Sequence, residues 1–445
     1  MPFIPHTHAD KESMLETLGI ASIADLFDEI PDRIKCDSLP DIPDGISEMA
    51  MLHHMAHRAQ EDASGVCFLG AGCYDHYIPA AVWDIASRGE FLTAYTPYQA
   101  EASQGTLQLV YEFQTMLASL TAMDVANASV YDGASALAEA ILMAVRVNRK
   151  SKSRRVLVPA SLHPSYLATV RSIVTHQGIE LELMTSHEGL TAVSDVDLEN
   201  AVAVVVQHPN FLGLLEDVDV LTNRAHDVDA LVIGVVNPMS LALLKPPGDW
   251  GDTGADIVCG DGQPLGIPMA SGGPSFGFLC TRMIHVRQLP GRIAGRTQDK
   301  DGNHGFVLTL QAREQHIRRA KATSNICTNQ GLLVTAATIY MTLLGPQGLH
   351  EIASSCVHNT HRLVDRLTEL PNVSMRFATP YFHECVLDFG ESTEALQQRM
   401  LDNGILPGYP LTGLIDKGDQ AMLVCATEVR TEQDIDRYYQ ELTNG

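Results

Sequence analysis

The segment 68–104 concentrates side chains that can contact a small polar ligand. Tyr95 and Tyr98 lie within it, and hydroxyl, amide and carboxylate groups flank them at Thr96, Gln99, Glu101 and Gln104. His76 stands earlier in the same segment. Several glycines and prolines interrupt it, so we expect an ordered loop with one short helix near residues 80–87. Such loops are often binding sites, although these tyrosines could equally cap the core with their hydroxyls in water.

The elements that would position this loop follow a helix–strand pattern. Residues 106–123 place apolar side chains at three- and four-residue spacing, which predicts an amphipathic helix. Continuous apolar runs then predict strands buried on both faces of a mostly parallel sheet. The predicted strands are residues 128–131, 155–159, 181–184, 201–207, 231–236, 257–260 and 276–281. Ligands are expected where such strands end, and the residues there are polar or rich in glycine and proline.

One of these strand ends leads into a helix through a turn of small residues. Asp132 or Ser135 can cap that helix, and Gly133 permits a tight entry. Free backbone N–H groups at such a point can hold a phosphate or a carboxylate. The motif has little specificity by itself, because many α/β proteins enter helices in this way.

The chain divides into three predicted parts. Residues 1–65 form an N-terminal helical arm, residues 66–328 a large α/β domain, and residues 329–445 a small C-terminal α+β domain. Within the arm, His53 and His57 stand at i, i+4 on a predicted helix, but no third ligand follows, so no metal is expected there. Residues 290–305 predict an exposed loop, and residues 306–325 a basic helix containing Arg313, Arg318, Arg319 and Lys321.

Composition excludes several classes of protein. The net charge of −24 argues against nucleic acid or an anionic membrane as a partner. There is no apolar run of transmembrane length and no basic-then-apolar leader pattern. The nine cysteines are scattered without a C-x-x-C pair, which is typical of reduced thiols. We therefore expect a cytoplasmic protein.

Three long strings resemble a known family. FLGAGCYDHY, RGEFLTAYTPYQAEASQGTLQ and YDGASALAEA resemble the glycine cleavage system P-protein, also called glycine decarboxylase or glycine dehydrogenase (aminomethyl-transferring). The likeness is strongest to the separate subunit 1 of the two-chain type, and it extends over most of the chain. It implies an aspartate-aminotransferase-like fold of the pyridoxal-phosphate-dependent transferases.

The resemblance also implies that the cofactor-bearing lysine is missing. In the family, the lysine follows a strand and precedes a glycine-rich stretch, and here Gln263 stands at that place. An amide cannot form the imine that holds the cofactor. The carboxylate that would pair with the pyridine nitrogen is expected near Gly234, where none occurs. We therefore predict no cofactor-binding residue in this chain, with pyridoxal phosphate held by a lysine-bearing partner, subunit 2.

By the same resemblance, the whole enzyme decarboxylates glycine and passes the aminomethyl group to the lipoyl arm of the H-protein. We predict that residues 95–104 cross the subunit interface and line the partner's pocket. Tyr95, Tyr98 and His76 are the predicted catalytic residues, and substrate binding is assigned to Thr96, Gln99, Glu101 and Gln104. Two alternatives remain: a self-sufficient pyridoxal-phosphate decarboxylase or transaminase using Lys245 or Lys321, and a structural or regulatory paralogue.

Overall fold

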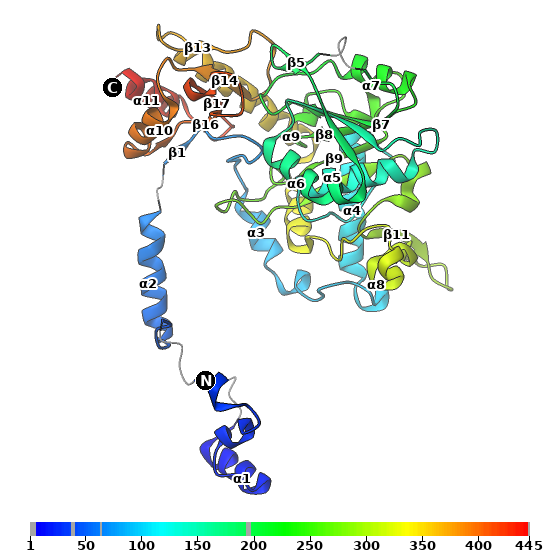
Figure 1. Cartoon of the computed structure of the whole chain (residues 1–445), viewed down its shortest axis with the longest axis vertical. Helices are drawn as coiled ribbons and strands as arrows, with labels where there is room; N and C mark the ends of the chain where they lie inside the picture. The colour runs from blue at the N-terminus through cyan, green and yellow to red at the C-terminus, as the bar shows by residue number, and fades with distance from the viewer. Residues whose placement is uncertain (1–5, 37–40, 63–64, 193–196, 444–445) are drawn as a thin grey trace. The chain divides into compact units, whose positions relative to one another are not determined.

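The structure is a computed structural model of the 445-residue chain, and it describes all residues except 1–5, 37–40, 63–64, 193–196 and 444–445. The chain forms two compact units, Met1–Ala63 and Ser64–Gly445 (Figure 1). The first unit contains helices α1 (His8–Leu18) and α2 (Glu48–Glu61), with two short 3₁₀ helices between them. Neither α1 nor α2 buries a residue.

A seven-stranded sheet organises the second unit. Its order is β2-β10-β9-β8-β7-β3-β4, and β10 alone is antiparallel to its neighbours. The strands are β2 (Val125–Ala126), β3 (Arg155–Pro159), β4 (Glu180–Met184), β7 (Ala201–His208), β8 (Leu231–Val236), β9 (Ile257–Asp261) and β10 (Gly277–Thr281). The mostly parallel sheet of the predicted fold is confirmed. The predicted strand at 128–131 is wrong, because β2 ends at Ala126 and residue Val130 makes only an isolated bridge to Gly277.

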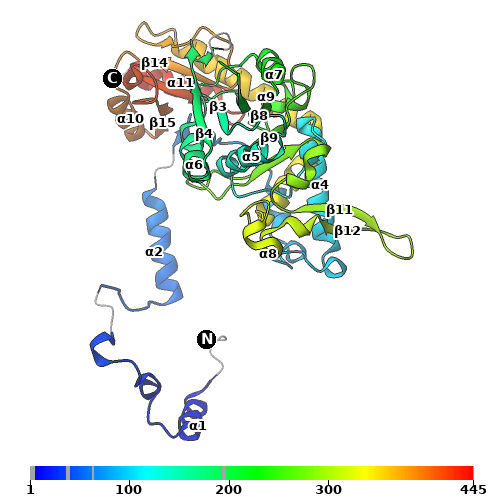
Figure 2. The ribbon, with the colours of Figure 1, turned by 45° about the vertical axis from the view of Figure 1, so that its right-hand side comes forward.

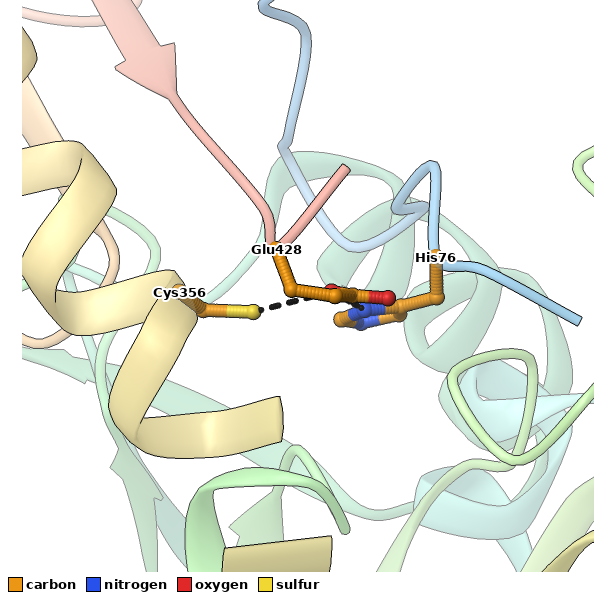
Figure 3. A group of neighbouring side chains, drawn as sticks. All are labelled: His76, Cys356 and Glu428. Carbon is orange, nitrogen blue, oxygen red and sulfur yellow. Dashed lines mark hydrogen bonds and ion pairs between the residues drawn. The ribbon is translucent and has the colours of Figure 1, made fainter. Parts of the chain in front are cut away.

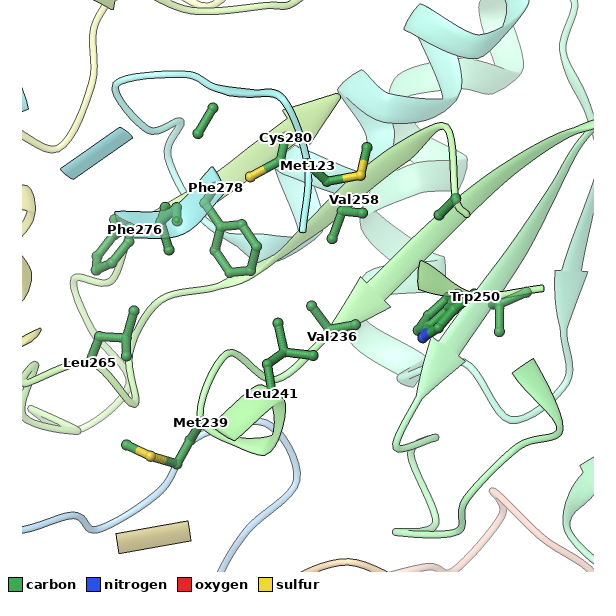
Figure 4. Close-up of a cluster of buried hydrophobic side chains, with 14 of the residues drawn as sticks. Met123, Val236, Met239, Leu241, Trp250, Val258, Leu265, Phe276, Phe278 and Cys280 are labelled. Atoms are coloured by element: carbon green, nitrogen blue, oxygen red, sulfur yellow. The ribbon is translucent and has the colours of Figure 1, made fainter. Parts of the chain in front are cut away.

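Helices cover both faces of this sheet, because strand side chains alternate between the faces. Residues such as Val205 and Ile233 pack with helices α5 (Gly133–Val147) and α6 (Pro164–Val174). Their sequence neighbours Val204 and Val232 pack on the opposite face. That face is covered by α3 (Ala80–Ala86), α4 (Gln104–Thr121), α7 (Val218–Asp227) and the first half of α9 (Gly331–Leu367). Figure 4 shows part of this second core, around Trp250, Phe276 and Phe278.

Residues 290–325 differ from the prediction. Strands β11 (Ile293–Gln298) and β12 (His304–Thr309) pair as an antiparallel hairpin, which projects from the unit in Figure 2. Half of the predicted exposed loop is therefore strand. The predicted basic helix shrinks to α8 (Gln315–Arg318) and two short 3₁₀ turns. Arg313 lies outside α8, and its guanidinium donates to the carbonyls of Leu289 and Gly291 instead of facing solvent.

The C-terminal part has its own core beside the large sheet. Strands β13 (Ser374–Met375), β14 (Glu384–Asp388), β16 (Tyr409–Pro410) and β17 (Ala421–Cys425) form a four-stranded sheet in the order β13-β14-β17-β16. Helices α10 (Thr393–Asp402) and α11 (Glu432–Thr443) accompany it. In addition, β1 (Val66–Cys67) pairs with β15 (Ile405–Leu406), which joins the start of the second unit to its end.

Helix α9 connects the two cores. Gly345 interrupts it with φ 62° and ψ −176° and is followed by Pro346, so α9 is two helices in sequence. By length and composition, α9 is the one described helix that could cross a membrane, which qualifies the expectation of no such run. Half of its most apolar window is buried in the fold, however, where Val334 and Tyr340 are fully buried. The apolar character of α9 is thus explained by its place in the core.

Candidate functional site

A cavity of about 50 Å³ lies beyond the carboxyl ends of β3, β7, β8 and β9. This is where an open α/β sheet is expected to bind a ligand. Its polar lining comes from four strand ends, from the loop after β1 and from β14. The polar and aromatic lining residues are Tyr74, His163, Tyr166, Gln207, Asn210, Phe211, Asn237, Asp261, His383 and Glu384.

Gln263 lies beside this cavity, and its side-chain amide forms hydrogen bonds with the surrounding backbone through both its nitrogen and its oxygen. The side-chain nitrogen donates to the carbonyls of Tyr74 and Ile267, both at 2.8 Å, and the oxygen accepts from the Tyr74 N–H at 2.8 Å. The residue is 3% exposed. Gln263 therefore fixes the loop that carries Tyr74 against the turn after β9.

Asp261, the last residue of β9, occupies the N-terminus of helix α5. Its carboxylate accepts from the Gly133 N–H at 2.9 Å, from the Gln263 N–H at 2.9 Å, and from the Ser275 hydroxyl. Asp132 caps the same helix through the Ser135 N–H at 2.7 Å, as its sequence predicted. Burial raises the pKa of Asp261, and the hydrogen bonds oppose that shift. A helix N-terminus that could hold a phosphate is thus already occupied by carboxylates.

The opposite side of the cavity carries a second buried acid. Glu384 accepts from the Ala71 N–H at 2.6 Å and from the Tyr74 hydroxyl at 2.8 Å. Burial raises the pKa of Glu384 to about 7, because the charged form loses its hydration. Neighbouring His383 is also buried, and burial lowers its pKa to about 3, so it is neutral at physiological pH.

These residues do not fit pyridoxal phosphate. Among the described residues, no lysine and no arginine lines the cavity, so neither an imine nor a cation for the phosphate is available. A phosphate at the α5 N-terminus would meet Asp261 and Asp132 instead of free N–H groups. The end of β8 offers Asn237, whose amide contacts His383 at 3.4 Å, and it offers no carboxylate for a pyridine nitrogen. Gly234 itself faces Trp250, away from this lining.

The two lysines that a self-sufficient pyridoxal-phosphate enzyme would use lie outside this cavity. Lys245 pairs with Asp219 at 2.8 Å on the surface, and Lys321 is exposed after α8. Neither residue lines the cavity at the strand ends. The geometry therefore gives the self-sufficient alternative no support.

His76 belongs to a buried polar cluster with Glu428 and Cys356 (Figure 3). Its Nδ1 lies 2.8 Å from Oε2 of Glu428, and the thiol of Cys356 donates to the same oxygen at 3.2 Å. These three types of side chain can bind metals, and their ligand atoms lie within 4.8 Å of one another. Their mutual hydrogen bonds account for the arrangement, so the prediction of no metal stays a prediction.

The loop 95–104 reaches the surface. Tyr95 is 86% exposed and Tyr98 is 48% exposed, while the Thr96 hydroxyl is buried without a partner. Gln99 and Glu101 are exposed. Gln104 is different, because its amide donates to the Phe306 carbonyl at 2.8 Å and accepts from the Phe306 N–H at 2.9 Å. Gln104 therefore joins α4 to the hairpin. Its amide is occupied by these bonds and is not a free side chain, as the predicted substrate-binding role would require.

Sequence reasoning missed two features of the site. Arg292 lies 5.5 Å from the centre of the Tyr98 ring and donates to its hydroxyl at 3.4 Å. Nothing in the sequence around Arg292 distinguishes it from the other arginines of residues 290–325. Glu384 was missed as well, because it stands in an apolar run whose only signal is the carboxylate itself.

The chain is similar over its length to proteins of known name. The family model for the glycine cleavage system P-protein matches residues 1–442. The probable glycine dehydrogenase (decarboxylating) subunit 1 of Legionella pneumophila is 58% identical and aligns with 99% of this chain and 98% of its own. The protein of that name from Thioalkalivibrio sulfidiphilus is also 58% identical, with 98% of each chain covered.

Solved structures agree with this likeness. A crystal structure of glycine decarboxylase (P-protein) of the glycine cleavage system, in inhibitor-bound form, has a TM-score of 0.91 at 42% identity and covers 100% of both chains. A glutamate decarboxylase from Lactobacillus brevis has a TM-score of 0.66 at 12% identity and covers 93% of this chain and 95% of its own. The second match shows the shared fold only.

Proposed function

Because the chain belongs to the glycine cleavage system P-protein family, as subunit 1 of the two-subunit glycine dehydrogenase (decarboxylating), we propose that it completes an active site whose cofactor the other subunit holds. In this proposal the partner is the lysine-bearing subunit 2, glycine is the substrate, and a lipoylated H-protein receives the aminomethyl group. The cytoplasmic location and the absence of a membrane or nucleic-acid partner remain predictions.

One observation carries the proposal. The cavity at the strand ends, where an enzyme of this fold would hold pyridoxal phosphate, has an amide at Gln263 and carboxylates at the α5 N-terminus. It has the wrong charge for a phosphate and no amine for an imine among its described lining residues. Pyridoxal phosphate acts as an electron sink in decarboxylations of amino acids. A chain of this family without a fitting pocket therefore depends on a partner for that chemistry.

The exposed loop supplies what the chain could add to the partner's site. Tyr95 and Tyr98 present phenols, and Gln99 and Glu101 present an amide and a carboxylate, all without burial in this chain. Exposed aromatic side chains are enriched where proteins meet. We propose that this loop covers the partner's cofactor pocket and positions glycine or the lipoyl arm.

The N-terminal unit supplies surface for a permanent complex. Apolar side chains are exposed throughout it, at Met14, Leu18, Ile23, Leu26, Phe27, Ile30, Ile34, Ile42, Ile46, Met49, Met51, Leu52 and Met55. Exposed apolar surface of this extent marks an interaction site. We propose an obligate complex with subunit 2 that buries more than ~2,000 Å² in total, as permanent complexes do.

Reduction with borohydride tests where the cofactor binds. The chain alone and its co-expressed complex with subunit 2 are mixed with pyridoxal phosphate, reduced and digested, and pyridoxyl-lysine peptides are identified by mass. We expect a stoichiometric adduct on the partner and none on this chain. An adduct on Lys245 or Lys321 would overturn the proposal and restore the self-sufficient alternative.

A further inference from the structure

Arg292 is a buried cation without a counter-ion. It is 4% exposed and lies directly before β11. Its guanidinium donates to the hydroxyl of Thr328 at 2.8 Å, to the side-chain oxygen of Asn329 at 3.1 Å and to the carbonyl of Cys327 at 3.1 Å. The fourth acceptor is the Tyr98 hydroxyl, and Nε has no partner. Every acceptor is neutral, and no carboxylate of the described residues forms an ion pair with Arg292.

The surroundings of Arg292 leave an excess of positive charge. A small pocket beside it, with room for about one water molecule, is also lined by Arg313 and Glu314. Arg313 donates to the carbonyls of Leu289 and Gly291, and Nε of Arg313 has no partner. Glu314 is the one carboxylate that lines this pocket among the described residues. Two guanidinium groups thus face one carboxylate. An unpaired buried charge is unfavourable, so an additional anion would stabilise this site.

Tyr98 connects this charge to the surface. Its ring lies against the Arg292 guanidinium, with 5.5 Å from the guanidinium carbon to the ring centre, and half of the tyrosine remains exposed. His316 contacts the other part of the ring at 5.4 Å between centroids. Tyr98 also belongs to the loop that we propose to face the partner's pocket. A group reaching Arg292 from outside the chain would therefore pass beside Tyr98.

We propose that Arg292, together with the Tyr98 hydroxyl, binds an oxyanion presented by the partner subunit. This inference rests on the proposed function, because it requires the loop to face the partner's site. Guanidinium groups bind carboxylates and phosphates, and both anions occur in such a site. The Nε–H of Arg292 is the donor that no described acceptor takes. The anion is the carboxylate of glycine or the phosphate of the cofactor. Changing Arg292 would weaken glycine binding in the first case and cofactor binding in the second.

The test uses the co-expressed complex with Arg292→Gln, which removes the charge but keeps polar donors. The matched control is Arg296→Gln, on the exposed part of the hairpin four residues away. Two dissociation constants are measured by spectroscopic titration: that of pyridoxal phosphate from the complex, and that of glycine from the cofactor-loaded complex. Methylamine serves as a third ligand, because it carries the amine of glycine without the carboxylate.

Loss of a charge-assisted contact should weaken one of these steps by about 10- to 100-fold. A weaker cofactor complex identifies the phosphate. Weaker glycine binding with unchanged methylamine binding identifies the carboxylate. If all three constants match those of Arg296→Gln in an assembled complex, Arg292 is a structural residue and the inference is wrong, while the proposed function stands. If the two chains do not assemble even in wild type, the proposed function itself fails.

A second variant, Arg292→Lys, is used if the complex that carries Arg292→Gln does not assemble. It keeps the positive charge and removes the paired donors, so the affected constant should rise by at least about threefold in the assembled complex. Unchanged constants for Arg292→Lys would then count against the inference.

Discussion

Tyr95 and Tyr98 lie three residues apart and have different surroundings. Tyr95 is 86% exposed, whereas Tyr98 contacts Arg292 and His316. Changing each tyrosine to phenylalanine removes only a hydroxyl, so the complex should still assemble. A hydroxyl that positions substrate contributes on the order of 1–3 kcal/mol in a dry site. We therefore expect turnover of glycine with H-protein to fall by roughly 10- to 100-fold.

Tyr77→Phe provides the control for these variants. Tyr77 is 63% exposed in the same glycine-rich region but lies outside the loop 95–104. Its turnover should equal that of wild type. Wild-type turnover in Tyr95→Phe and Tyr98→Phe would mean that these phenols merely cap the fold, and the predicted catalytic role would then be wrong.

Glu384 should make the stability of the fold depend on pH. Its pKa is raised from 4.5 to about 7, so the folded chain keeps a proton that the unfolded chain releases. The contribution of Glu384 to stability is then fully present below about pH 4.5 and is lost as pH rises to about 7. Between pH 5.5 and 7 the loss is at most about 2 kcal/mol, at about 1.4 kcal/mol per unit.

Glu384→Gln removes this ionisation and keeps an acceptor for the Ala71 N–H. We expect the thermal midpoint of wild type to drop relative to that of Glu384→Gln as pH rises through this window. Other raised carboxyls, such as Asp261, are present in both proteins and cancel in the difference. Parallel midpoints across pH 5.5–7 would show that Glu384 does not titrate there.

The types of these side chains were readable from the sequence, but their partners were not. Gln104 and Glu101 look alike as polar residues beside two tyrosines, yet Gln104 bonds to Phe306, which is 202 residues away. His76 likewise meets Glu428 and Cys356 from distant segments. Such contacts depend on tertiary packing, and no local pattern encodes them. A buried arginine such as Arg292 is invisible for the same reason.

Helix α9 offers a prediction about its break. Gly345 has φ 62° with open space around its Cα, so alanine would fit sterically there but would be strained in its backbone. Gly331, the first residue of α9, also has open space but an ordinary φ. Gly345→Ala should destabilise the chain by about 1–3 kcal/mol. Gly331→Ala should be neutral or stabilise it by up to about 1 kcal/mol.

Thermal midpoints of the two variants measure this contrast in one helix. Equal midpoints would show that α9 can close its break at residue 345 without strain. Both variants change glycine to alanine, so the comparison isolates the backbone conformation from the added methyl group.

The buried strands were predicted well because they are continuous apolar runs. AVAVVVQ and LVIGVV became β7 and β8 with nearly the predicted ends. The β11–β12 hairpin was missed because its strands carry glycine and charge, as in PGRIAGRTQDKDGNHG. The hairpin is held by backbone pairing and by Gln104. Its apolar residues Ala294 and Leu308 also pack against α4, but glycine and charged residues separate them in the sequence. The strands β15 and β16 gave no signal because two residues are too few to show a strand pattern.

The N-terminal unit provides a prediction about assembly. On helix α2, Met49, Leu52 and Met55 recur at three-residue spacing and are 80%, 58% and 54% exposed. We expect Met49→Ser, Leu52→Ser and Met55→Ser, combined, to weaken the complex with subunit 2 by at least about tenfold, because each buried apolar side chain contributes about 1.5–3 kcal/mol. Co-elution at falling concentration measures this affinity.

The control combines His54→Ser and His57→Ser on the same helix, since both side chains are polar and exposed. This double variant should co-elute like wild type. If the apolar variant also co-elutes unchanged, the exposed methionines of α2 do not belong to the interface, and the apolar surface of this unit needs another explanation.

The carboxylate of Asp261 at the start of α5 would oppose cofactor binding even if this chain had a lysine near the cavity. Gln263→Lys would restore an amine, but the new lysine would enter a pocket whose anion site is already filled by the chain's own acid. We expect this single variant to remain colourless with pyridoxal phosphate, and a stoichiometric visible imine band would contradict that. Binding of pyridoxal phosphate would need at least a second substitution, at Asp261, and we expect neither substitution alone to produce it. The proposed division of labour between the two subunits would thus be maintained by a barrier that no single substitution removes.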